Sequence, residues 1–326
     1  MTTAVIVDAV RTPGGKRNGR LRGWHAVDLA AEPLKALVER NGLDPAQVDD
    51  VIMGCVMQVG EQALNIGRNA VLAAGFPESV PATTLDRQCG SSQQSIHFAA
   101  QGVIAGAYDV VIAAGIEHMT HTPMGSSVVR DLGFPFGPQL MGRYAERGGL
   151  VSQGISAEMI ADQWDLSREQ LDAFGAQSQN RAATAAAEGR FEKEIVSLTV
   201  KDDEGKPTDE VFSADEGIRP DTTAEVLANL KPAFKPDGKV TAGNSSQITD
   251  GSAAVLIMSE EKAAALGLTP RARFHAFALA GVDPVTMLSG PIPATKSVLE
   301  RAKLTMDDID LVEINEAFAS VVLAWE

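Results

Sequence analysis

The chain has 326 residues, 44% hydrophobic and 22% charged, a composition typical of a globular protein with one large core or two modest ones. Its formal charge of −15 argues against a nucleic-acid-binding protein, because phosphate contacts require a basic face. No apolar run is long enough to span a membrane and the N-terminus lacks a signal-peptide pattern, so we expect a cytoplasmic protein.

Strand and helix signals alternate over the first part of the chain. Apolar runs predict strands at 4–10, 51–56, 83–85 and 110–114. Helical spacing of apolar residues predicts helices at 28–41, 65–74 and 90–107, with Gly42 ending the first. This alternation predicts an α/β fold with parallel or mixed sheets.

Residues 120–250 interrupt this alternation. They contain loops rich in glycine and proline, a polar stretch, and predicted helices at about 153–164 and 168–188. Ser167 and Gln170 have the spacing of a capping box at the start of the second helix. We expect an inserted, largely helical lobe, because long insertions of this kind usually cover binding sites.

The later part of the chain repeats the early pattern. Residues 36–54 align without a gap to residues 297–315, with identities that include Glu39, Arg40, Leu43 and Asp49 and with matched apolar positions. Chance similarity between two helix-to-strand units is the alternative to an internal duplication. Duplication would place the counterpart of Cys89 beyond Glu326, so we expect a C-terminally truncated chain whose second half is incomplete.

Only two cysteines occur, too few for a disulfide framework. Cys89 lies at a predicted strand-to-helix turn, where backbone N–H groups and the helix dipole favour the nucleophilic thiolate. Gly90 leaves room beside the sulfur, and the nearby amides are suited to stabilising an oxyanion. Cys89 is therefore a candidate nucleophile, whereas Cys55, inside an apolar strand, is expected to be buried and structural.

Several segments along the chain have the character of family signatures, among them VDAVRTPGGKRNG, DRQCGSSQQSIHFAAQ, KPAFKPDGKVTAGNSSQITDGSAAVLIMS and LVEINEAFA. They resemble signatures of the thiolase family, in the family's order, and the resemblance covers essentially the whole chain. The resemblance implies a duplicated, five-layered α/β/α/β/α fold with an inserted helical loop lobe and an incomplete second half. The expected domains are the N-terminal half at 1–119 with the strand at 251–259, the substrate-binding lobe at 120–250, and the C-terminal half at 260–326.

Thiolase-family members cleave 3-ketoacyl-CoA with CoA to acetyl-CoA and a shortened acyl-CoA, or run the reverse condensation. The resemblance therefore implies an acyltransferase of fatty-acid β-oxidation that works through an acyl-Cys89 intermediate. It implies coenzyme A as a substrate, no separate cofactor, and assembly as a homodimer or homotetramer.

The resemblance also implies roles for residues outside the cysteine turn. Asn315 should position a water that helps stabilise the oxygen of the thioester enolate. The residues implied to contact CoA or to line the acyl and pantetheine pocket are Arg219, Ala242, Gly243, Ser246, Met287 and Phe318.

Two departures from the family pattern bear on activity. Val151 to Gly154 stand where many biosynthetic members have His-Met-Gly, a variant that resembles acyltransferases of fatty-acid or sterol side-chain degradation. The family's Gly-His-Pro and Cys-x-Gly motifs do not occur in the sequence, and no other histidine is an obvious substitute. A fragment that binds CoA without turnover therefore stays an alternative, as does a related condensing enzyme such as a ketoacyl synthase.

Other cofactors are not indicated. His118 and His121 are three residues apart, but no third ligand follows a recognisable pattern, so we expect no metal site. Neither GxxxxGK nor GxGxxG occurs, so we expect neither ATP nor NAD.

Overall fold

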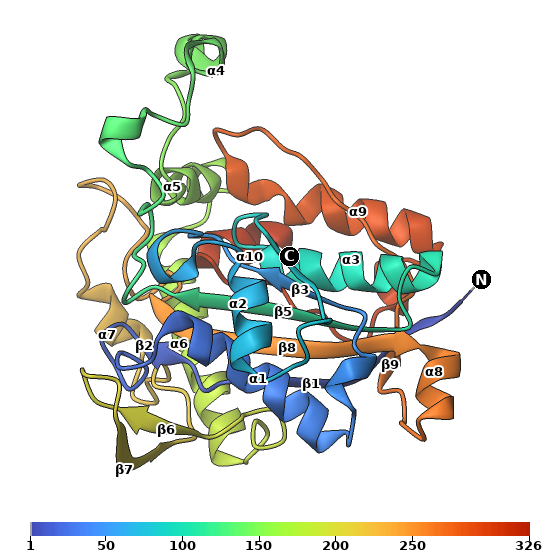
Figure 1. Cartoon of the computed structure of the whole chain (residues 1–326). Coiled ribbons are helices and arrows are strands. Elements are labelled where there is room, and N and C mark those ends of the chain that lie inside the picture. The colour runs from blue at the N-terminus through green and yellow to red at the C-terminus, as the bar shows by residue number, and fades with distance from the viewer. Residues whose placement is uncertain (1) are drawn as a thin grey trace. The chain divides into compact units, whose positions relative to one another are not determined.

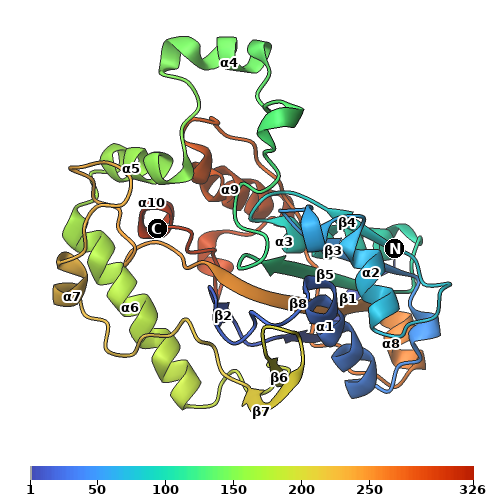
Figure 2. The same ribbon diagram turned by 60° about the vertical axis from the view of Figure 1, so that its left-hand side comes forward.

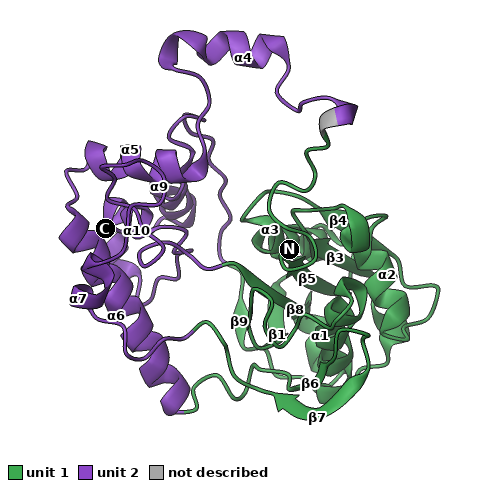
Figure 3. Cartoon of the chain, turned by 90° about the vertical axis from the view of Figure 1, so that its left-hand side faces the viewer, with its two compact units in different colours: residues 1–129, 189–217, 248–274 green, residues 130–188, 218–247, 275–326 purple. Residues whose placement is uncertain are grey.

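The computed structural model describes residues 2–326, which divide into two compact units (Figure 3). Unit 1 consists of the described residues up to Val129 together with 189–217 and 248–274. Unit 2 consists of 130–188, 218–247 and 275–326. Among residues 2–326, no helix combines the length and the apolar composition that crossing a membrane requires.

Unit 1 is built on a seven-stranded mixed sheet, with the order β4-β3-β5-β8-β1-β9 and β2 paired to β8. The strands are β1 (Ala4–Arg11), β2 (Gly15–Lys16), β3 (Asp50–Gly54), β4 (Ala82–Leu85), β5 (Val110–His118), β8 (Thr249–Ser259) and β9 (Ala272–Arg273). β3 pairs in parallel with β4 and β5, whereas β8 is antiparallel to both β5 and β1. The predicted α/β architecture with a mixed sheet is confirmed.

Helices cover both faces of this sheet (Figure 1). They are α1 (Ala26–Arg40), α2 (Ile66–Ala73), α3 (Ser91–Ala105) and the short α8 (Glu260–Ala265). The predicted helices at 28–41, 65–74 and 90–107 are confirmed to within two residues at each end. Gly42 adopts a left-handed conformation (φ 56°) just after α1, which is the role in ending the helix that its position predicts.

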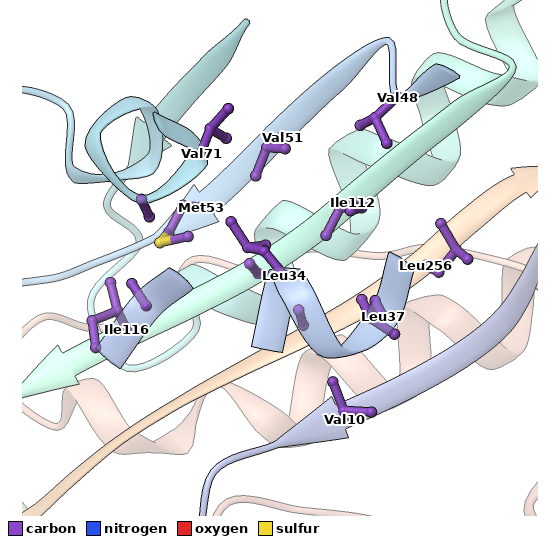
Figure 4. Close-up of a cluster of buried hydrophobic side chains, with 14 of the residues drawn as sticks. Val10, Leu34, Leu37, Val48, Val51, Met53, Val71, Ile112, Ile116 and Leu256 are labelled. Carbon is purple, nitrogen blue, oxygen red and sulfur yellow. The ribbon is translucent and has the colours of Figure 1, made fainter. Parts of the chain in front are cut away.

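The main core of unit 1 lies between the sheet and helices α1 and α2 (Figure 4). Alternate strand residues point to this side, among them Met53 and Ile112, and meet Leu34 and Leu37 of α1. The intervening residues, such as Val111, are also buried, on the face that α3 covers. Burial on both faces explains why these strands read as continuous apolar runs.

Strand β5 extends further than its apolar run predicts. The prediction ends at Ala114, but β5 continues to His118 because it pairs with β8 along its whole length, to His118 opposite Asp250. Ladder hydrogen bonds do not depend on side-chain polarity, so the polar residues Glu117 and His118 remain in the strand.

The polar stretch after residue 197 also forms strands, which the prediction of a largely helical lobe did not include. β6 (Leu198–Lys201) and β7 (Pro207–Phe212) form a two-stranded antiparallel sheet. Leu198 and Phe212 are buried in the core of unit 1, and this burial stabilises an otherwise exposed hairpin.

Unit 2 is helical in its described residues. Its α-helices are α4 (Pro138–Tyr144), α5 (Gln153–Gln163), α6 (Arg168–Ala187), α7 (Ala224–Ala228), α9 (Pro291–Ala302) and α10 (Ala319–Trp325). The predicted capping box is confirmed, since Ser167 accepts from the Gln170 N–H and the Gln170 side chain accepts from the Ser167 N–H. α6 and α7 lie side by side (Figure 2).

Single 3₁₀ turns occur in both units. They are η1 (Pro45–Gln47), η2 (Gly60–Gln62), η3 (Arg130–Leu132), η4 (Ala145–Arg147), η5 (Met287–Ser289) and η6 (Met306–Asp308). η1 and η6 occupy matching positions in the two aligned segments, as the internal repeat predicts.

The repeat fails in one respect. Residues 311–315 align with β3 but form no strand, and Leu311 is 90% exposed. A strand is stable only when neighbouring strands satisfy its backbone groups. β3 has β4 and β5 on its two sides, whereas none of the strands described in residues 2–326 pairs with 311–315.

Candidate active site

Cys89 lies in the short turn between β4 and α3, on unit 1. Its side chain is exposed. The next residue, Gly90, is the N-cap of α3, so no N-cap side chain occupies the space at the start of the helix. The preceding residue, Gln88, has a left-handed backbone (φ 45°), which is uncommon for a residue other than glycine. The sequence-predicted strand–cysteine–helix arrangement is therefore present, with an additional backbone constraint just before the cysteine.

Side chains on both sides of Cys89 hold this turn. The Asp86 carboxylate accepts hydrogen bonds from the Gln88 backbone N–H (2.5 Å) and from its side-chain amide (3.0 Å). The Ser91 hydroxyl accepts from the Arg87 N–H (3.0 Å) and donates to the Gln88 carbonyl (2.6 Å). Neither Asp86 nor Ser91 was among the predicted site residues.

Two glycines allow the start of α3 to lie directly against the sheet. A Cβ atom on Gly54, at the end of β3, would lie 2.3 Å from the Ser92 backbone nitrogen. One on Gly115, in β5, would lie 2.6 Å from the Ser92 Cβ. The Ser95 hydroxyl adds a hydrogen bond to the Ala114 carbonyl (3.0 Å). The cysteine turn is thus anchored at the carboxyl ends of the parallel strands.

The second cysteine has different surroundings. Cys55 is buried, as predicted from its apolar strand. Burial, with the negative charge of Glu117 as the next cause, raises the pKa of the Cys55 thiol to about 12. Since the thiolate is the nucleophile, Cys55 is unreactive near neutral pH.

The two histidines that gave a weak metal pattern are engaged in hydrogen bonds. His118 is fully buried, with Nε2 3.1 Å from the Leu21 carbonyl oxygen. His121 stacks on it at 4.1 Å between ring centroids and contacts both Glu61 (3.1 Å) and the Arg22 carbonyl (2.8 Å). Over residues 2–326, no group of three or more ligand-type side chains could hold a metal ion.

The remaining candidate residues belong to unit 2, where two of the predicted segments meet. The Ser246 N–H donates to the Ala317 carbonyl (2.9 Å), and the Ala319 N–H donates to the Asn244 carbonyl (2.9 Å). This pairing brings the loop that contains Ala242, Gly243 and Ser246 beside the segment that contains Asn315 and Phe318.

Packing around this loop explains one glycine. A Cβ atom on Gly243 would lie 2.5 Å from Leu227 and 2.7 Å from Leu230. The loop therefore approaches α7 and the residues after it too closely for any side chain at this position.

An aromatic pair lies next to the loop. The ring of Phe318 is 7% exposed and meets Phe234 edge to face, with centroids 5.9 Å apart. Phe234, 41% exposed, also lies over Gly154, where a Cβ atom would be 2.1 Å from the ring. Sequence reasoning missed Phe234, although a lone aromatic residue between Lys231 and Lys235 in a polar loop was a usable signal.

The other three predicted residues are less enclosed. Arg219 is exposed, with its backbone N–H bonded to the Gln179 side chain (2.7 Å). Met287 is half-buried at the start of η5, and Asn315 is exposed. The next residue, Glu316, accepts a hydrogen bond from Ser178 of α6 (2.6 Å), which fixes the segment that carries Asn315.

Comparison with known proteins identifies the family. The thiolase N-terminal domain matches residues 4–261, and the thiolase C-terminal domain matches residues 268–326. The chain belongs to the thiolase family. Since both matches are to thiolase domains, they favour this family over the ketoacyl synthase alternative.

Similar proteins are enzymes of this family. The chain is 49% identical over 322 residues to a 3-ketoacyl-CoA thiolase of Saccharophagus degradans, covering 98% of this chain and 80% of that protein. It is 46% identical over 331 residues to a steroid 3-ketoacyl-CoA thiolase of Mycobacterium tuberculosis, covering 100% and 79%. An acetyl-CoA acetyltransferase of Bacillus anthracis has a similar structure, with a TM-score of 0.89, 40% identity, and coverage of 100% of this chain and 82% of that one. The predicted thiolase fold is confirmed.

Proposed function

We propose that the protein is an acyl-CoA C-acyltransferase that cleaves 3-ketoacyl-CoA with CoA, or runs the reverse condensation, through an acyl-Cys89 intermediate. The observation that carries this proposal is the exposed thiol of Cys89 at a braced strand-to-helix turn, in a chain that matches thiolase domains along its length. The names of the similar proteins support the same reaction class.

The reaction proceeds in two steps. The Cys89 thiolate attacks the C3 carbonyl carbon of 3-ketoacyl-CoA. The C2–C3 bond then breaks, its electron pair leaves as the enolate of acetyl-CoA, and the enolate takes up a proton. In the second step the thiol of another CoA loses its proton, which balances the proton taken up by the enolate, and its sulfur accepts the acyl group from Cys89, so the Cys89 thiolate is regenerated. The amides of the turn stabilise the oxyanion formed at each attack.

The residues of unit 2 bind the CoA part of the substrate. Asn315 holds a water that stabilises the enolate oxygen, and Arg219 contacts the nucleotide end of CoA. The residues that meet the pantetheine arm and the acyl group are Ala242, Gly243, Ser246, Met287 and Phe318. The backbone pairing of residues 244–246 with 317–319 supports this grouping, and Phe234 joins it through its contact with Phe318.

The substrate class we propose is a 3-ketoacyl-CoA of fatty-acid or sterol side-chain degradation. Support comes from Val151 to Gly154, which replace a His-Met-Gly pattern, and from the names of two relatives, one a 3-ketoacyl-CoA thiolase and one a steroid 3-ketoacyl-CoA thiolase. CoA is a substrate, and the reaction requires no further cofactor.

A thiolysis assay tests the proposal, by following the loss of 3-ketoacyl-CoA enolate absorbance on addition of CoA. Cys89→Ala should lower kcat by about three orders of magnitude or more, because the covalent route is lost. Cys55→Ala is the matched control and should keep activity, since that thiol is buried and protonated. A folded wild-type chain that binds CoA without turnover would overturn the proposal and favour the non-catalytic alternative.

We also propose that the enzyme acts in the cytoplasm as a homodimer or homotetramer. The family resemblance supports this assembly. Light scattering coupled to size-exclusion chromatography measures the mass directly, and a monomer at micromolar concentration would contradict it.

A further inference from the structure

The turn that carries Cys89 adopts a conformation that its sequence alone does not favour. Gln88 is left-handed, and neither a glycine nor an asparagine stands there to ease it. A strained backbone of this kind persists only where surrounding groups hold it in place, and such positions cluster at functional sites.

The Ser91 hydroxyl is placed to do this. It accepts from the Arg87 N–H and donates to the Gln88 carbonyl, so it bridges the residues on both sides of the strained φ angle. The Gln88 carbonyl belongs to the peptide group whose nitrogen is that of Cys89. Because the Ser91 N–H also donates to this carbonyl (3.1 Å), the peptide that leads into Cys89 is fixed by two hydrogen bonds.

Ser91 is itself firmly placed. It is 4% exposed and is the first residue of α3, next to Ser92, whose backbone lies against Gly54. The sheet therefore fixes the position of Ser91, and the hydrogen bonds of Ser91 then fix the conformation of the turn. Asp86, the other group that contacts Gln88, is exposed and gives a weaker hold, since its hydrogen bonds compete with water.

We propose that Ser91 is a positioning residue for the reaction: its buried hydroxyl locks the Gln88–Cys89 peptide so that the sulfur is presented at the start of α3. This inference rests on the proposed role of Cys89 as nucleophile. Ser91 touches no reacting atom, and its effect reaches the substrate only through the position of the cysteine.

The test measures the rate at which iodoacetamide alkylates Cys89, by intact mass, in wild type and in three variants. Ser91→Ala removes the hydroxyl that bridges the turn, and Ser91→Thr keeps a hydroxyl there. Ser259→Ala is the matched control, because Ser259 is also buried and its hydroxyl also forms a backbone hydrogen bond, from the Lys262 N–H, but at the end of β8 that lies next to Val110, away from the carboxyl ends of β3 and β5. Urea unfolding of each variant reports its stability.

We expect Ser91→Ala to slow alkylation by about tenfold, because loss of a buried hydrogen bond lets the turn relax. Ser91→Thr should stay within about threefold of wild type, and Ser259→Ala should keep the wild-type rate while losing similar stability. If Ser91→Ala is folded and reacts at the wild-type rate, or if Ser91→Thr is as slow as Ser91→Ala, the inference is wrong.

The assay separates this inference from the proposed function. Alkylation needs no substrate, so a change in rate identifies the role of Ser91 whether or not turnover occurs. If wild-type Cys89 is fully alkylated while thiolysis activity is unaffected, the proposed function fails instead. If turnover requires Cys89 but Ser91→Ala retains wild-type kcat and alkylation, only the positioning role fails.

Discussion

The imidazole of His118 is held in surroundings that favour its neutral form. Burial is the main cause and lowers the pKa of His118 below the ordinary value of 6.5. The nearby Asp250 carboxylate, at 3.6 Å, opposes this, and the stacked ring of His121 reinforces it. The Leu21 carbonyl and Glu61 oppose it more weakly, and the net direction is downward.

A pH-dependent stability follows from this direction. The unfolded chain binds a proton at His118 at a higher pH than the folded chain, so the free energy of unfolding rises with pH in that window. The contribution of His118 to the free energy of unfolding should be fully present above pH 6.5. It should fall by up to about 1.4 kcal/mol per pH unit as the pH drops from 6.5 to the lowered pKa of His118 in the folded chain. Urea unfolding at a series of pH values measures this slope.

His118→Gln should flatten the slope below pH 6.5, and His275→Gln is the control because His275 is exposed. An unchanged slope in His118→Gln would show that other groups carry the acid sensitivity. Glu61, which contacts His121, is one such group. Burial raises its pKa, but hydrogen bonds from the Ala26 N–H and His121 outweigh burial, so its contribution is lost only below the ordinary carboxyl value of 4.5.

At the scale of elements, the contact between α3 and the sheet depends on residues without side chains. Gly54 and Gly115 come from different strands and meet the same residue of α3, Ser92. The helix cannot move outward to admit a methyl group without also shifting the cysteine turn, because Ser91 and Ser92 are consecutive.

Gly54→Ala should therefore lower both stability and activity. The added methyl would meet backbone atoms at 2.3 Å, and such overpacking costs about 1–3 kcal/mol. Gly142→Ala, in α4, is the matched control, since a Cβ there meets nothing within 4 Å. Chemical denaturation with a parallel thiolysis assay gives both quantities. A Gly54→Ala chain as stable and active as the control would refute the close contact.

The sequence predicted those elements whose signal is local. The helices around 28–41 and 168–188 have complete apolar spacing and end signals, and both were located to within two residues. Residues 311–315 form no strand although they align with β3, because a strand depends on partners that its own residues do not specify. The end of β5 was missed for the same reason, since its last residues are ordered by β8.

The residues of the candidate site likewise fall into those with a local sequence signal and those whose role depends on distant contacts. Cys89 was recognisable because the turn, the glycine and the helix that follow are contiguous. Phe234, Gly54 and Ser91 were not recognised, because their importance lies in contacts with residues distant in sequence or in the backbone angle of a neighbour.

At the scale of the whole molecule, the dominant property is a net charge of −15. Repulsion among like charges opposes the compact state, and salt weakens it by shortening the Debye length from about 30 Å at 0.01 M to about 8 Å at 0.15 M. Tm should therefore rise when NaCl is increased over this range. Sucrose at matched osmolality is the control, and a Tm that is unchanged or lower in NaCl would show that attractive ion pairs dominate.

The position of β8 in the sheet has a consequence for synthesis on the ribosome. β8 (Thr249–Ser259) lies between β1 and β5 and is antiparallel to both, although β5 ends as early as His118. A nascent chain that has emerged only as far as the helical segments before Thr249 therefore presents two long, apolar, unpaired strand edges. Such edges are templates for aggregation, and closing a loop of this length is slow. Chaperone dependence of this protein should accordingly be greatest during translation of the residues between β5 and β8. During this interval the sheet that supports the cysteine turn still lacks β8.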